Sequence, residues 1–144
     1  MSSKINLLIR RMPSVDDPSF AIVRLVCGVA FVTPDGTTET RRAIMDTGAP
    51  VSLLPWGLWQ PCLVRKLGDG WVRGIVPKPE CALPVVNAEV ACLLSDRDTT
   101  IGPLTIRAHL SHADTVPLIL GFGGLLDKAQ VYLDLTKDIA YLEF

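Results

Sequence analysis

The sequence lacks an excess of charge of either sign, a basic tract and an apolar run long enough to cross a membrane. Its 14 Lys and Arg residues nearly balance its 15 Asp and Glu residues, which gives a net charge of −1. We therefore expect no nucleic-acid partner, because nucleic acids are bound through clustered basic side chains. The longest apolar stretch, residues 20–32, is interrupted by Arg24 and falls short of a membrane span. We therefore expect no membrane partner.

The N-terminus also lacks the long apolar core of a secretion signal. Residues 5–9 form only a short stretch between Lys4 and Arg10. The sequence therefore predicts a cytoplasmic protein, whose thiols stay reduced. No C-x-x-C pair is present, so we expect free, buried thiols. The cysteines are Cys27, Cys62, Cys81 and Cys92.

Two histidines, His109 and His112, lie three residues apart and raise the question of a metal site. Residues 104–110 alternate like a strand, in which positions three apart point to opposite faces. No cysteine or carboxylate falls at a matching short spacing typical of zinc. We therefore expect no metal and no cofactor. A metal-dependent hydrolase stays as a third hypothesis, which sensitivity to a chelator would revive.

Apolar residues make up 49% of the sequence and charged residues 20%, which is typical of one globular domain with a substantial core. Short apolar segments alternate with turn residues. We predict strands over residues 4–12, 20–32, 38–45, 83–94, 103–110, 131–135 and 139–144. We predict one helical turn over 56–61, an irregular segment over 63–79 and a short helix over 122–129. This pattern favours an all-β, barrel-like domain.

The most informative stretch, residues 43–55, places Asp46, Thr47 and Gly48 between two apolar runs. The first run ends a predicted buried strand, and the glycine lets the backbone turn sharply. Asp-Thr-Gly alone also fits an ordinary turn, but solvated turns usually have polar neighbours. A carboxylate between apolar segments is costly unless it is paired, hydrogen-bonded or protonated. We therefore predict that Asp46 is a working acid.

A second apolar strand, residues 117–121, ends in Ile-Leu-Gly and precedes the predicted helix. Together with Asp-Thr-Gly-Ala and a final aromatic strand, residues 140–144, it resembles the retropepsin-like aspartic proteases, above all their single-domain bacterial members. The resemblance covers residues 20–144 and leaves residues 1–19 as an N-terminal extension. It implies an all-β, retropepsin-like closed β-barrel with one short C-terminal helix, active as a homodimer.

Aspartic peptide hydrolysis needs two carboxylates that share one proton across a water molecule. The ionised one takes a proton from the water, and the protonated one donates to the scissile carbonyl. The sequence has a single Asp-Thr-Gly, so the second carboxylate must be Asp46 of a second copy. The resemblance implies that Thr47 makes hydrogen bonds across the two-fold axis, that Gly48 lets the substrate backbone approach and that Ala49 lines the cleft. The expected partners are a second copy and a peptide or protein substrate.

The family closes its cleft with a β-hairpin flap, and by order along the chain we place the flap tip within residues 72–79. Gly74, Ile75 and Val76 are the expected substrate contacts in this segment. An ordinary surface loop is an equal alternative, because retroviral flap tips are rich in glycine whereas Pro77 stiffens this one.

The sequence departs from the retroviral pattern at two positions that pair in those enzymes. Pro50 stands where they carry an Asp, and Phe122 stands where they carry an Arg. That support for a dimer is therefore absent. We keep a second hypothesis from another class, a peptide-binding or assembly module on the same fold with little or no hydrolysis. Cleavage of an unstructured protein such as casein distinguishes the two.

Overall fold

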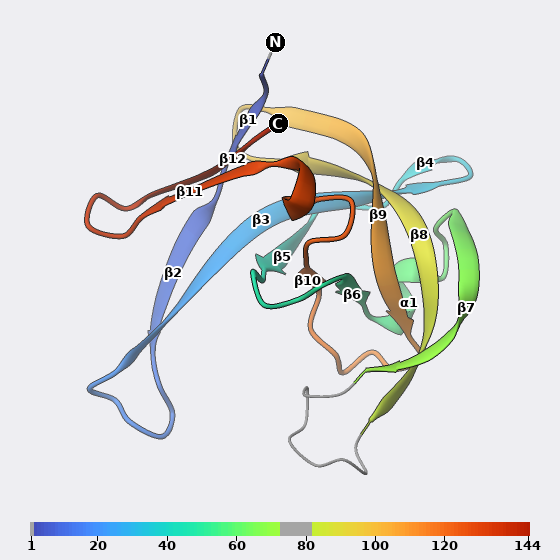
Figure 1. The fold of residues 1–144 in the computed structure, drawn as a ribbon, viewed down its shortest axis with the longest axis horizontal. Coiled ribbons are helices and arrows are strands. Elements are labelled where there is room, and N and C mark those ends of the chain that lie inside the picture. The colour runs from blue at the N-terminus through green and yellow to red at the C-terminus, as the bar shows by residue number, and fades with distance from the viewer. Residues whose placement is uncertain (1, 73–81) are drawn as a thin grey trace.

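The computed structural model describes residues 2–72 and 82–144, and strands dominate it (Figure 1). The large sheet has the order β2 (Leu8–Pro13), β3 (Ala21–Thr33), β5 (Arg41–Met45), β10 (Ile119–Leu120), β6 (Ser52–Leu54), β9 (Thr100–Ser111), β8 (Leu83–Ser95) and β7 (Val64–Val72). In addition, β4 (Gly36–Thr37) pairs with β3, and β8 pairs with β3. The predicted all-β class is confirmed.

A smaller sheet has the order β1 (Lys4–Asn6), β12 (Ile139–Glu143) and β11 (Gln130–Asp134). Most predicted strands therefore form within a few residues of their expected bounds. In Figure 1 the β2–β3 and β11–β12 hairpins extend to the same side of the molecule, away from β7 and β8. None of the helices within residues 2–72 and 82–144 is long and apolar enough to cross a membrane.

Within residues 2–72 and 82–144, two short helical segments accompany the sheets. The predicted turn after the Asp-Thr-Gly stretch is the α-helix α1 (Trp56–Trp59). The helix predicted over residues 122–129 is shorter than expected, since only a 3-10 turn, η2 (Leu126–Lys128), forms. Gly124 has a φ of +78°, a left-handed conformation that an α-helix does not contain.

The prediction that residues 63–79 are irregular is wrong for its described part. Residues 64–72 form β7, which pairs with β8 along its length at the edge of the large sheet. The register shifts between Lys66 and Gly68, and Gly68 has a φ of +151°. The glycine that the sequence pattern assigned to a loop therefore lies at a β-bulge within the strand.

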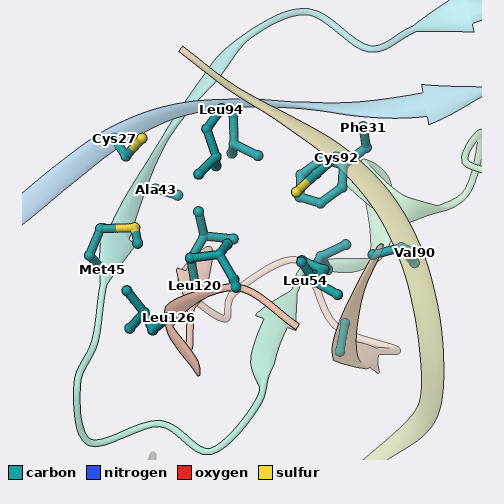
Figure 2. Packing of buried hydrophobic residues seen from close by; sticks show 14 of the residues in the cluster. Cys27, Phe31, Ala43, Met45, Leu54, Val90, Cys92, Leu94, Leu120 and Leu126 are labelled. Atoms are coloured by element: carbon teal, nitrogen blue, oxygen red, sulfur yellow. The ribbon is translucent and has the colours of Figure 1, made fainter. Parts of the chain in front are cut away.

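One apolar core supports the backbone around the Asp-Thr-Gly segment. Strand alternation builds it, because Ile106, Ala108 and Leu110 on β9 are all buried. Figure 2 shows Leu120 of β10 between Met45 of β5 and Leu54 of β6. Full burial of a leucine side chain stabilises a fold by about 1.5–3 kcal/mol, so this packing fixes the three short strands firmly.

The first residues of the chain belong to both sheets. β1 pairs with the last strand, β12, whereas β2 pairs with β3. Ser3 and Phe144 exchange two backbone hydrogen bonds of 3.1 and 2.9 Å. Ile5 and Leu142, a register pair in these strands, are fully buried. The N-terminal strands therefore pack as part of the folded body.

Candidate active site

Asp46 follows β5 directly, at the point where that strand runs beside β10. The two strands are parallel, and the Asp46 N–H donates to the Leu120 carbonyl at 2.9 Å. The Gly48 N–H donates to Asp46 Oδ1 at 2.8 Å, which holds the carboxylate over its own loop. Asp46 is half-buried, whereas Thr47 is exposed. The sequence prediction that Asp46 is presented by a buried strand is confirmed by this geometry.

The glycine of Ile-Leu-Gly permits a close approach between two backbones. A Cβ atom on Gly121 would lie 2.5 Å from the Ala49 carbonyl oxygen and 2.7 Å from that of Val51. The next residue, Phe122, donates its N–H to the Ala49 oxygen at 3.0 Å. Only a residue without a side chain fits here, so the two motifs recognised in the sequence meet in space.

A buried hydroxyl, which the sequence analysis missed, adds a further contact between the Asp46 loop and Gly121. Ser52 is fully buried, and its Oγ accepts a hydrogen bond of 3.1 Å from the Gly121 N–H. The Gly123 N–H donates to the Pro50 carbonyl at 2.9 Å. The loop from Asp46 to Ser52 is thus tied to residues 121–123 at several points. The serine after an apolar segment was the available sequence signal, but its partner lies far along the chain.

A cleft of about 570 Å³ opens beside the carboxylate. Its described lining comes from the Asp-Thr-Gly loop, from the end of β7, from β9 and from the segment entering β10. The lining residues are Asp46, Gly48, Ala49, Pro50, Val51, Leu53, Trp71, Val72, His109, Pro117 and Ile119. The cleft therefore contains three of the predicted site residues, Asp46, Gly48 and Ala49.

The predicted flap contacts cannot be placed relative to the cleft. Gly74, Ile75 and Val76 lie outside the described residues. Val72, the first residue of the segment predicted to form the flap tip, is the last residue of β7 and lines the cleft. Residues 72–79 therefore begin at the cleft wall.

A second groove, of about 370 Å³, lies against the other side of Asp46. It contains Thr47, which is absent from the lining of the first cleft. Its remaining walls come from β3, β5 and the β11–β12 hairpin. They are Val23, Arg24, Leu25, Ile44, Met45, Val131, Leu133 and Leu135. Asp46 thus borders two separate hollows of different composition.

The two histidines occupy different surroundings. His109 lies in the cleft, and its Nδ1 is 2.7 Å from Asn87 Oδ1 on the neighbouring strand. Burial, and secondarily the positive charge of Arg107, lower the pKa of His109 below its ordinary value. The His112 ring lies 5.7 Å from the Trp56 ring, outside the cleft lining. Within residues 2–72 and 82–144, no group of three potential metal ligands comes together.

Comparison with known proteins shows a similarity of structure. No protein-family model matches the chain, and no curated protein matches it by sequence. The crystal structure of a retropepsin-like aspartic protease from Rickettsia conorii is similar to this chain with a TM-score of 0.55 and 14% sequence identity. The similarity covers 100% of this chain and 92% of that one. At this identity it supports a shared retropepsin-like fold and carries no information on activity.

Proposed function

We propose that this protein is an aspartic endopeptidase that works as a homodimer. The observation that carries the proposal is the position of Asp46. It lies at the wall of an open cleft, on a loop that hydrogen bonds join to residues 121–123. Its carboxylate is half-buried and is held by the Gly48 N–H rather than neutralised by a cation among the described residues. Such a group is available to take or give a proton at a bound peptide.

The second groove supports the proposal that the other carboxylate comes from a second copy of the chain. In a two-fold dimer each copy presents the same surface, so a groove that borders Asp46 brings the two Asp46 side chains toward one axis. The two acids then share one proton and activate the water between them. Thr47 is exposed in this groove, where its hydroxyl is available for hydrogen bonds across the axis.

The cleft supports the assignment of the substrate as an extended peptide. Gly48 and Ala49 line it next to the carboxylate, and the end of β7 forms its opposite wall. In this proposal Gly74, Ile75 and Val76 follow from that wall and close over the peptide. The closed barrel is likewise part of the proposal, supported by the pairing of β8 with β3. The cytoplasmic location and the division at residue 20 stay predictions.

The test replaces Asp46 by Asn, which keeps size and shape but removes the acid. We expect cleavage of casein to fall by about 10³-fold or more, because both steps of the acid–base exchange are lost. The matched control is Asp16→Asn, an exposed carboxylate on the loop after β2, which should leave cleavage unchanged. Thermal unfolding and the sedimentation mass should be the same for all three proteins.

Mixing the proteins tests the shared site directly. When Asp46→Asn chains are refolded with wild-type chains, activity should fall as the square of the wild-type fraction, because one carboxylate alone cannot complete the site. A linear fall would instead assign a complete site to each chain and contradict the homodimer.

The alternative is a peptide-binding module on the same fold. Pro50 and Phe122 favour it, because they occupy the two positions at which retroviral enzymes carry an ion pair. Here those segments are joined by the backbone bond from Gly123 to Pro50 instead. Binding of casein by the wild-type protein without any cleavage would select this alternative.

A further inference from the structure

We propose that His109 selects the substrate, by accepting a hydrogen bond from a hydroxyl or amide side chain of the bound peptide. The inference deepens the proposed function, since it assigns a specificity residue to the same cleft. It needs only that the cleft binds an extended peptide, and it stands whether or not the peptide is then cleaved.

The composition of the cleft singles out this side chain. Among its described lining residues, Asp46 and His109 carry the only titratable side chains. The neighbours of His109 in the cleft are apolar, and its partner in the register with β6 is Leu53. An imidazole on an apolar wall is a specific polar contact point. A substrate side chain that covers the ring without pairing with it removes water from the ring nitrogen and gives no hydrogen bond in return.

The hydrogen bond to Asn87 fixes the tautomer of the ring. Asn87 and His109 are directly opposite in the β8–β9 register, and the two side chains meet at 2.7 Å. An amide oxygen only accepts, so the hydrogen of neutral His109 must be on Nδ1. The lone pair is then on Nε2, which has no hydrogen-bond partner among residues 2–72 and 82–144. His109 thus offers the cleft an acceptor.

A glycine on the next strand makes room for this arrangement. A Cβ atom on Gly70 of β7 would lie 2.8 Å from Asn87 Nδ2. The amide of Asn87 therefore occupies space that any larger residue at position 70 would fill. Burial, and secondarily the positive charge of Arg107 two residues before it on β9, lower the pKa of His109 and so favour the neutral ring. Gly70 thus makes room for Asn87, and Asn87 places the proton of the neutral ring on Nδ1, which leaves Nε2 as an acceptor.

The test uses peptides that differ by one isosteric exchange. An alanine-based octapeptide carries Thr at one position in turn, and a second set carries Val at the same positions. Binding to the Asp46→Asn protein is followed by NMR of its two histidine rings, the only histidines in the chain. At one position we expect Thr to bind about tenfold more tightly than Val, the effect of one net hydrogen bond. The His109 signals should move and the His112 signals should not.

Four variants separate specificity from a structural role. His109→Leu should abolish the preference for Thr, whereas His109→Gln, whose side-chain oxygen reaches a similar place, should retain part of it. His112→Gln is the matched control and should retain all of it. Nitrogen-15 spectra should show His109 with its proton on Nδ1, and Asn87→Leu should remove that bias.

The outcomes distinguish this inference from the proposed function. Equal binding of Thr and Val at every position, an unchanged preference in His109→Leu, or absence of any peptide binding would overturn the assignment of His109. A Thr preference that depends on His109, together with no cleavage by the wild-type protein, would uphold it and reject the protease. Cleavage with no His109-dependent preference would give the reverse result.

Discussion

The two hollows beside Asp46 differ in the way their walls are built. The larger cleft is lined by the Asp46 loop, by regular strands and by His109, whose ring is hydrogen-bonded to Asn87. The smaller groove has apolar walls and is bounded by a hairpin that extends from the body (Figure 1). One carboxylate thus faces a surface suited to peptide recognition on one side and a surface suited to burial on the other.

The hairpin side carries an unusual amount of exposed apolar surface. Leu133 is 48% exposed, Val131 42% and Leu135 39%, and all three line the groove. Arg11 of β2 holds the hairpin by an ion pair of 2.6 Å with Asp138 and a hydrogen bond of 3.1 Å to the Leu135 carbonyl. A contiguous apolar surface on a fixed support is typical of an interface. Under the proposed function, the second copy therefore covers the groove and the substrate binds in the cleft.

The largest effect on dimer formation and activity is expected from a charge placed in the groove. Leu133→Asp should convert the dimer to a monomer and lower activity at micromolar concentration by 100-fold or more, since a buried unpaired carboxylate costs several kcal/mol. Sedimentation and casein cleavage measured on the same sample check both effects.

The matched control is Leu63→Asp, another exposed leucine that lies outside both hollows. It should remain dimeric and active. A fully active dimer of Leu133→Asp would place the interface elsewhere on the molecule.

A smaller effect is expected at Gly121, which packs against the Asp46 loop. Gly121→Ala would press a methyl group into the carbonyls of Ala49 and Val51, which are backbone atoms and cannot rotate away. We expect a loss of about 1–3 kcal/mol in the free energy of unfolding, measured in urea, with activity reduced as the Asp46 loop shifts. In the control Gly57→Ala, the nearest atom is a side-chain oxygen of Asp114 at 3.0 Å rather than a backbone atom at 2.5 Å, so the loss should be smaller.

The smallest expected effect concerns the cleft side and pH. The pKa of His109 is lowered in the folded protein by burial and by Arg107, from an ordinary value of 6.5. Below pH 6.5 the unfolded chain therefore binds more protons than the folded one, and stability falls as pH falls toward the lowered pKa. His109→Gln should flatten the pH dependence of unfolding in this window, whereas His112→Gln should not. Parallel curves for wild type and His109→Gln would show that the ring is not held neutral.

The sequence predicted those parts of the site that depend on local patterns. The approach of an apolar strand to Asp46, and the glycine that ends the Ile-Leu-Gly strand, are local in this sense, and both are found where expected. The prediction of an irregular segment was wrong over residues 64–72, because a bulge at an edge strand tolerates glycine as well as a loop does.

Contacts between distant strands could not be predicted in the same way. Asn87 is one of few polar residues in the mainly apolar strand β8, and His109 was considered only as a metal ligand. Their register pairing depends on the alignment of β8 with β9, which no local pattern specifies. The polar interruption at Asn87 was nevertheless a signal, since such a residue in a buried strand needs a partner.

The pairing of β1 with β12 has a consequence for how the protein is made. Ile5 and Leu142 are paired and fully buried although they are far apart along the chain, so Ile5 stays uncovered until Leu142 has been synthesised. Pairings between such distant segments form slowly, because a long loop must close before any contact compensates for it. We therefore expect the small sheet to form late in folding, after the contacts within the β8–β9 hairpin.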